Sequence, residues 1–222
     1  SPSDIQSIMK KAMVERLKDV YGISWFAEDG VSMPIRVAFM KDVAVIGLDT
    51  SGVSLHKRGY RQMTAKAPIT ETLAAALIML TPWKKDRILV DPFCGSGTFP
   101  IEAAMMAADM APGMNRSFLA EEWKHLIPRK CWYEAVDEAN ERVRIDPDVD
   151  IQGYDLDGQI VRAARQNAKM AGVDSMIHFQ QRAVKDLHHS KPYGFLIMNP
   201  PYGERLESFR GLDRGSMYLI TS

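Results

Sequence analysis

An apolar run ends in a short group of residues that could hold an amine. Residues 195–198 are Phe-Leu-Ile-Met, and Asn199, Pro200, Pro201 and Tyr202 follow directly. The Asn side chain offers an acceptor oxygen and an amide donor, and consecutive prolines hold a backbone carbonyl in a restricted direction. A Tyr ring offers a face on which a flat ring can stack. Two acceptors beside a stacking surface suit an amino group on a heteroaromatic base. The alternative is a Pro turn that merely ends a strand.

A second candidate group is a glycine-rich turn. Residues 91–97 read Asp-Pro-Phe-Cys-Gly-Ser-Gly and lie between an apolar run and a helical pattern. Gly95 and Gly97 allow the backbone to come close to a ligand, and the helix start supplies unpaired N–H groups. A dinucleotide fingerprint needs a third Gly three residues after Gly97, where this chain has Pro100. The turn therefore does not match a pyrophosphate-binding turn, and a nicotinamide dehydrogenase is a poor interpretation.

The acidic residue ahead of the glycines narrows the class of ligand. Asp91 would repel phosphate and would attract a cationic or amine-bearing group. A small ligand with a positive centre and an amino acid tail suits this turn, and S-adenosylmethionine is such a ligand. The alternative is a strand-to-helix turn that binds nothing.

Three further carboxylates follow expected strands. Asp155 follows the strand expected at 149–154 and could accept hydrogen bonds from both hydroxyls of a ribose. It lies beyond the roughly 20-residue interval of dinucleotide folds, so residues 113–148 are expected to be an insertion. Asp157 is expected to cap the next helix. Asp186 could accept a hydrogen bond from an adenine amino group, or it could be an exposed loop residue.

Other reactive residue types give weaker signals. Cys94 lies inside the glycine-rich turn and is expected to be a packing residue. His188 and His189 have no Cys or His at metal-ligand spacing, so no metal site is expected. No cysteine lies near Asn199, which argues against covalent attack on a pyrimidine ring.

The elements that must position these groups alternate between strands and helices from residue 68 onward. The expected helices run from Pro68 to a point before Pro82 and over 101–108 and 160–171, and the expected strands cover 88–90, 149–154, 176–179 and 195–198. Such alternation predicts an α/β fold with a parallel sheet and helices on both faces. Because ligands of open α/β sheets bind beyond the carboxyl ends of the strands, the candidate groups are expected at one edge.

The first 50 residues have a different pattern. Apolar spacing predicts a helix over 5–20, and two strands are expected at 35–39 and 43–48, joined by Lys41 and Asp42. A helix beside a hairpin is small for an independent core. We therefore expect an α+β domain that begins ahead of this sequence.

A compact basic and aromatic segment follows at 55–61. Lys57, Arg58 and Arg61 could bind RNA phosphates. The alternative is that they pair with carboxylates of a neighbouring domain.

Composition limits the classes of protein to which this chain can belong. The chain has 222 residues, of which 28 are Lys or Arg and 28 are Asp or Glu, so global charge does not indicate a nucleic-acid partner. Two cysteines suit a reducing cytoplasm better than a disulfide framework. Neither a membrane-spanning run nor a signal-peptide pattern is present, so a cytoplasmic protein is expected.

The motifs together resemble a known family. Residues 91–98, ending in Gly95-Ser96-Gly97-Thr98, and residues 199–206, beginning Asn-Pro-Pro-Tyr-Gly, resemble the S-adenosylmethionine-dependent RNA guanine-N2 methyltransferases that carry a THUMP domain. Residues 48–61 are similar to the segment that joins THUMP to the catalytic domain in the branch acting on large-subunit ribosomal RNA. Residues 67–80 resemble the helix ahead of the first motif, which often lines the methionine end of the cofactor.

This resemblance implies an organisation in three parts. Residues 1–50 would be the C-terminal part of a THUMP RNA-binding domain, residues 51–66 the junction, and residues 67–222 a Rossmann-like class I methyltransferase domain. After Leu206 the chain is too short for the usual seven-stranded sheet. Residues 217–222 look like a strand that belongs further downstream, so the C-terminal part is expected to be incomplete, with a loop omitted near 208–216.

The resemblance also implies roles for individual residues. The implied catalytic residues are Asn199, Pro200 and Tyr202. The implied cofactor-binding residues are Asp91, Phe93, Gly95, Gly97, Thr98, Asp155, Asp186 and Pro68. The expected reaction is methyl transfer from S-adenosylmethionine to the N2 amine of a guanine in 23S ribosomal RNA. Alternatives are a tRNA guanine-N2 enzyme, an adenine-N6 nucleic-acid methyltransferase, and a non-catalytic RNA-binding assembly factor. The Asn-Pro-Pro-Tyr group itself suits guanine, adenine and cytosine alike.

Overall fold

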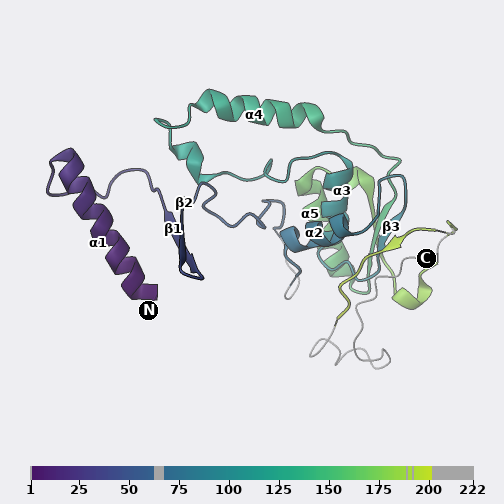
Figure 1. The fold of residues 1–222 in the computed structure, drawn as a ribbon. Helices are drawn as coiled ribbons and strands as arrows, with labels where there is room; N and C mark the ends of the chain where they lie inside the picture. The colour runs from purple at the N-terminus through teal and green to yellow at the C-terminus, as the bar shows by residue number, and fades with distance from the viewer. Residues whose placement is uncertain (1, 63–67, 189, 192, 202–222) are drawn as a thin grey trace. The chain divides into compact units, whose positions relative to one another are not determined.

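The structure, a computed structural model, describes residues 2–62, 68–188, 190–191 and 193–201 (Figure 1). The chain divides into two compact units, Ser1–Leu48 and Asp49–Ser222. Among the described residues, none of the helices is both long enough and apolar enough to cross a membrane.

The first unit contains one helix and one hairpin. Helix α1 covers Pro2–Tyr21, and the antiparallel strands β1 and β2 cover Ile35–Met40 and Val43–Leu48, as the sequence predicted. Lys41 and Asp42 join the strands with φ of 47° and 61°, the left-handed conformation of hairpin turns that match strand twist. Large apolar side chains on β1 and β2 are exposed, Val45 and Ile46 to 62% each.

The second unit is built on a parallel sheet of four strands in the order β5-β4-β3-β6. The strands are β3 (Leu89–Asp91), β4 (Ile151–Asp155), β5 (Ile177–Gln181) and β6 (Phe195–Leu196). The chain moves outward from β3 to β4 and β5, and then returns to place β6 on the other side of β3. The strand order therefore reverses between β3 and β6, and such reversal points are where open α/β sheets bind ligands.

Helices flank the sheet, which confirms the predicted α/β class. They are α2 (Glu71–Leu80), α3 (Thr98–Ala107) and α5 (Gly158–Ala171), and in the described part of the chain they pack on one face (Figure 1). Leu89 and Ile151 face these helices, whereas Val90 and Tyr154 belong to a smaller cluster on the opposite face. The sequence predicted helices on both faces, but the three predicted helices share one face, and no α-helix among the described residues belongs to the cluster on the opposite face.

Local sequence explains where the helices begin and end. The α5 apolar face, Val161, Ala164 and Ala168, recurs at helical spacing and is buried. The Asp157 side chain accepts a hydrogen bond from the Gln159 N–H at 2.7 Å, which confirms the predicted cap. Helix α3 begins three residues earlier than predicted, because Pro100 lies in its first turn, where no intrahelical N–H bond is lost.

A long insertion separates α3 from β4, as predicted. It contains a 3₁₀ turn η1 (Leu119–Glu122) and helix α4 (Arg129–Arg142), which buries none of its residues. Two more 3₁₀ turns, η2 (Asp174–Met176) and η3 (Val184–Asp186), lie on either side of β5.

Candidate active site

Three of the predicted site residues lie at the carboxyl ends of neighbouring strands. Asp91 ends β3 and Asp155 ends β4, while Asn199 follows β6. The Ile197 N–H donates to the Val90 carbonyl at 3.0 Å, and Asn199 and Pro200 continue from there, both half-buried. Strand pairing thus brings Asp91 and Asn199 to the two sides of the reversal point.

The glycine-rich turn is tied to the end of β4. The Cys94 N–H donates to the Tyr154 carbonyl at 2.8 Å, and the Gly95 N–H donates to Asp155 Oδ2 at 3.0 Å. The second carboxylate oxygen of Asp155 accepts from the Asp157 N–H at 3.0 Å. One carboxylate therefore holds both the turn and the entry to α5, at the position predicted for a ribose acceptor.

The two glycines of the turn have different surroundings and therefore different roles. Gly97 has φ of 89°, and a Cβ there would lie 3.0 Å from the Phe179 ring and 3.1 Å from the Ala164 Cβ. Gly95 has φ of 52°, and a Cβ there would meet nothing within 4 Å. Gly97 consequently permits close packing of the turn on the core, whereas Gly95 borders open space in which a ligand could lie.

Asp91 is buried beneath this turn. Its Oδ1 accepts a hydrogen bond from the Phe93 N–H at 3.0 Å. The pKa of Asp91 is raised to about 8, chiefly because the carboxyl is buried; the Phe93 N–H opposes this rise, and the nearby Asp155 charge adds to it. Burial also raises the pKa of the Cys94 thiol, which agrees with a packing residue rather than a nucleophile.

A buried polar network lies against the turn. Arg61 Nε pairs with Glu71 Oε1 at 3.2 Å, and Arg61 Nη2 donates to Thr98 Oγ1 at 2.8 Å and to the Ile69 carbonyl at 3.0 Å. The side chains of Arg61 and Glu71 are only 13% and 4% exposed. This network fixes the start of α2 against the start of α3, and it directs the Thr98 hydroxyl toward Arg61.

A second buried pair lies on α3. Arg58 Nη2 lies 3.5 Å from Glu102 Oε2, and the Tyr60 hydroxyl donates to Glu102 Oε1 at 3.0 Å. Burial raises the pKa of Glu102 and of Tyr60, and the Arg58 charge partly opposes the rise at Glu102. Two of the three cations predicted to bind RNA, Arg58 and Arg61, thus have carboxylate partners inside the unit, which is the alternative that the sequence left open. Lys57 is exposed.

Asn167 joins the turn to the junction from α5, and sequence reasoning missed it. Its side chain is fully buried, donates to the Ser96 carbonyl at 3.1 Å, and accepts from the Gln62 N–H at 3.2 Å. An Asn among alanines on the apolar face of a helix was the signal that could have found it.

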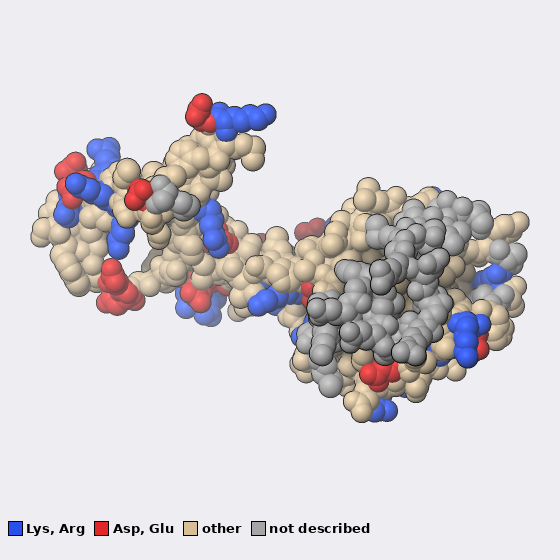
Figure 2. Space-filling model, turned by 90° about the horizontal axis from the view of Figure 1, so that it is seen from below, with Lys and Arg blue, Asp and Glu red and all other residues tan. Residues whose placement is uncertain are grey.

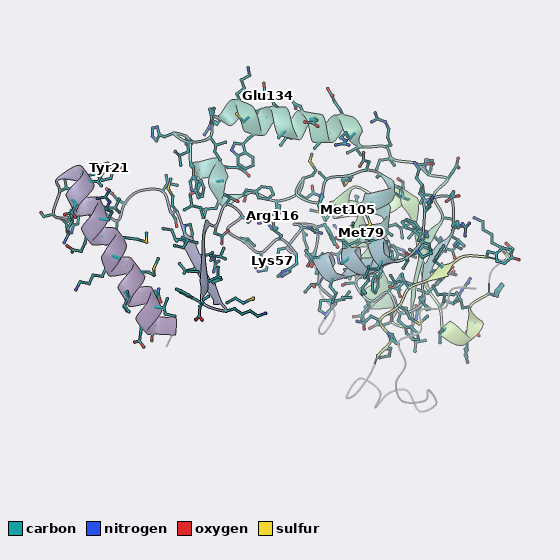
Figure 3. The ribbon with its side chains drawn as sticks, in the orientation of Figure 1. Tyr21, Lys57, Met79, Met105, Arg116 and Glu134 are labelled. Atoms are coloured by element: carbon teal, nitrogen blue, oxygen red, sulfur yellow. The ribbon has the colours of Figure 1, made fainter. Side chains whose placement is uncertain are left out.

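Residues 51–57 are held by Arg116, another residue that the sequence did not single out. Its guanidinium donates to the carbonyls of Ser51, Val53, Ser54 and Lys57, at 2.8 Å for Ser54 and 3.3 Å for Lys57. Figure 3 shows Arg116 and Lys57 close together. Because Arg116 belongs to the insertion between α3 and β4, that insertion serves as a support for residues 51–57.

Two buried atoms beside the turn lack partners. Glu71 Oε2 and Ser96 Oγ have no hydrogen-bond partner among the described residues. An unpaired buried polar atom is costly, so these atoms would gain from a bound ligand. Together with the open space at Gly95 and the carboxylates Asp91 and Asp155, they suit a small amine-bearing nucleoside ligand.

The remaining predicted site residues are more exposed or lie outside the described residues. Pro68 and Phe93 are half-buried, and Asp186 is exposed at the end of η3. Tyr202 lies outside the described residues. Within the described ranges, no cluster of three or more His, Cys, Asp or Glu side chains could hold a metal ion.

A family assignment follows from residues 58–218, which match the model of UPF0020, described as an RMKL-like methyltransferase domain. This match covers most of the chain, and the chain belongs to that family.

Two named relatives are similar over nearly all of the sequence. YpsC of Bacillus subtilis (strain 168), whose name places it among RNA methyltransferases, is 43% identical over 238 residues, which include 100% of this chain and 62% of YpsC. The ribosomal RNA large subunit methyltransferase K/L of Shewanella sp. (strain ANA-3) is 40% identical over 90% of this chain and 29% of that protein. The chain therefore spans only part of the relatives it matches.

Solved structures support the fold. A structure from Listeria monocytogenes, described as a predicted N6-adenine-specific DNA methylase, has a TM-score of 0.87 and 44% identity over 94% of this chain and 55% of its own. The structure of SMU.472, described as a methyltransferase complexed with SAH, has a TM-score of 0.84 and 42% identity over 93% of this chain and 54% of its own. These similarities confirm the class I methyltransferase-like sheet.

Proposed function

We propose that this chain carries the catalytic part of an S-adenosylmethionine-dependent RNA methyltransferase that modifies the N2 amine of a guanine in 23S ribosomal RNA. The observation that carries the proposal is the placement of Asn199 and Pro200 at the strand-order reversal, across from Asp91 and the glycine-rich turn. Relatives named as RNA and large-subunit ribosomal RNA methyltransferases support the substrate class.

The residues at the edge suit the cofactor. Asp155 would accept hydrogen bonds from the ribose hydroxyls, Gly95 would leave room for the backbone to approach, and Asp91 would face positive charge. The partnerless Glu71 Oε2 and Ser96 Oγ would gain polar contacts. The bound cofactor would supply a methyl group on a positively charged sulfur. SAH in the related SMU.472 structure supports this assignment.

The chain's own contribution would be the alignment of the amine. An exocyclic amine is a weak nucleophile because its lone pair is conjugated with the ring. As the nitrogen–methyl bond forms and the sulfur–methyl bond breaks, hydrogen bonds from the amine to Asn199 Oδ1 and to the Pro200 carbonyl would direct that lone pair and stabilise the positive charge that develops on nitrogen. The methylated amine would then release one proton to water. We assign Tyr202, outside the described residues, to stacking on the base after it leaves its helix.

The first unit would supply RNA contacts. We assign residues 1–50 to the C-terminal part of a THUMP domain, residues 51–66 to the junction, and residues 67–222 to the methyltransferase domain. A helix followed by a hairpin with exposed apolar side chains supports a fragment of a larger α+β domain.

An adenine-N6 methyltransferase is the second candidate. Its supports are that Asn199 and Pro200 offer acceptors to any exocyclic amine, and that the Listeria structure is described as an adenine-specific DNA methylase. A tRNA guanine-N2 enzyme would use the same chemistry. The sequence retains the residues expected at the catalytic edge, Asp91, Gly95 and Asn199, and this argues against a non-catalytic assembly factor.

The cellular test is a map of methylated nucleotides in ribosomal RNA from cells that lack the protein. We expect the loss of one N2-methylguanosine in large-subunit RNA, and its return with the wild-type gene but not with Asn199→Ala. Loss of an N6-methyladenine would favour the second candidate. An unchanged map of ribosomal and transfer RNA would refute the first candidate, and it would refute the second if N6-methyladenine in DNA were also unchanged.

A further inference from the structure

Helix α5 and the edge strand β5 line a basic groove that includes no residue of the glycine-rich turn. The groove has a volume of about 570 Å³ and is lined by Arg162, Arg165 and Lys169 from α5 and by His178 from β5. Asp174 is the one acidic residue in its lining. Strand β5 is the edge of the described sheet, so its outward backbone groups are not used by another described strand.

The charge on α5 differs from that of the chain as a whole. Lys and Arg equal Asp and Glu at 28 each, and on the face shown in Figure 2 the two signs are interspersed. Every charged side chain within α5 is basic, whereas α4 carries both signs. The helical spacing of Arg162, Arg165 and Lys169 places them on the face opposite to the buried alanines.

The three cations are not equivalent. The Arg165 guanidinium donates to the Phe179 carbonyl, so it covers an outward carbonyl of the edge strand. Arg162 and Lys169 are exposed, and neither forms an ion pair or hydrogen bond within the described part of the chain. The groove is therefore lined by two cations without partners among the described residues, Arg162 and Lys169, on either side of Arg165, and its lining contains one acidic residue.

We propose that this groove binds the phosphodiester backbone of the RNA substrate outside the catalytic edge. Helix α5 begins directly after Asp155 and Asp157, at the edge predicted for the cofactor, and runs about 20 Å from there at its rise per residue. A strand of RNA that follows the helix would meet Arg162 and then Lys169. Arginine and lysine facing open solvent suit phosphate, which binds without sequence specificity. This inference rests on the proposed RNA methyltransferase function.

The test compares two double variants with the same change of charge. Arg162→Gln/Lys169→Gln removes the free cations of the groove and leaves Arg165 in place. Arg129→Gln/Lys130→Gln removes two cations from α4, which buries no residue. The affinity of each protein for deproteinised large-subunit RNA is measured over a range of salt concentrations, together with its affinity for S-adenosylmethionine and its thermal stability.

Loss of two phosphate contacts should reduce the slope of log affinity against log salt by about 1.4 to 1.8. We expect that reduction in the groove variant only, with cofactor affinity unchanged. An equal slope in the groove variant and the wild type, or an equal reduction in the α4 variant, would overturn the proposal. The proposal would also be overturned if the groove variant lost binding to polyglutamate and kept its affinity for RNA, because that result would indicate an acidic protein partner. If the double variant does not fold, Lys169→Gln alone should give about half the reduction.

Failure of the groove and failure of the proposed function give different results. If the wild-type protein methylates RNA but the groove variant has the same salt slope as the wild type, the proposed function holds and the groove does not contact RNA. A wild-type protein that binds RNA through the groove but transfers no methyl group retains the contact and lacks the function.

Discussion

Replacement of Arg61 by Ala would measure how strongly the segment around Arg61 is fixed to the starts of α2 and α3. The change leaves the Glu71 carboxylate, 4% exposed, without its cation, and it removes the donor to Thr98 Oγ1 and to the Ile69 carbonyl. Removal of one partner of a buried ion pair costs about 3–5 kcal/mol. With a slope of about 2 kcal/mol per molar urea, the midpoint of unfolding should fall by about 1.5–2.5 M.

Two matched variants make this prediction specific. Lys57→Ala removes an exposed cation of the same segment and should change the free energy of unfolding by less than about 0.5 kcal/mol. Arg61→Met combined with Glu71→Leu removes both charges and should recover most of the loss, because an apolar pair replaces a buried ionic one.

The opposite result would refute the reasoning. If Arg61→Ala lowers the free energy of unfolding by less than about 1 kcal/mol and weakens RNA binding as Lys57→Ala does, then Arg61 faces RNA phosphates in solution. The buried pair with Glu71 would then be incorrect.

Three further predictions concern the turn and the junction. Gly97→Ala should cost about 2–4 kcal/mol of folding free energy, because the left-handed backbone is strained and the new Cβ contacts the core. Gly95→Ala should cost about 1–2 kcal/mol and should also weaken S-adenosylmethionine binding. Urea titration measures the first effect and binding calorimetry the second, and equal effects of the two variants would contradict the different roles of the two glycines. Because the folded Asp91 has its pKa raised to about 8, it holds a proton that the unfolded chain releases, so stability should fall as pH rises from about 4 toward 8. Denaturation across that range should show a flatter profile for Asp91→Asn, and cofactor affinity of the wild type should rise as Asp91 ionises; a profile unchanged by the substitution would show that Asp91 does not titrate there. Arg116→Ala should release the junction and open the Lys57 peptide bond to trypsin, which is followed by mass spectrometry, and continued protection would contradict the support described for the insertion.

Periodicity and local turn chemistry were sufficient to predict most elements from sequence. Helix α5 and its Asp157 cap depend on neighbouring residues only, and the hairpin turn at Lys41 and Asp42 follows from two short apolar runs. The placement of Asp91, Asp155 and Asn199 at one edge followed from the rule that parallel strands end together.

Roles that depend on contacts between distant segments were not visible in the sequence. Gly95 and Gly97 look equivalent there, and only the packing of Phe179 on Gly97 distinguishes them. Arg58 and Arg61 form a basic segment in sequence, but their partners, Glu102 and Glu71, are on separate helices. Nothing in the local pattern specifies such pairing, because it arises only when the helices pack.

Alignment of a guanine amine by Asn199 is the step on which the proposed function depends. The direct measurement is incubation of the purified protein with methyl-labelled S-adenosylmethionine and large-subunit RNA from cells that lack the protein, followed by digestion and mass spectrometry of the nucleosides. We expect label in N2-methylguanosine, with loss of transfer in Asn199→Ala while cofactor affinity is retained. Label in N6-methyladenosine, or transfer by Asn199→Ala at the wild-type rate, would contradict it.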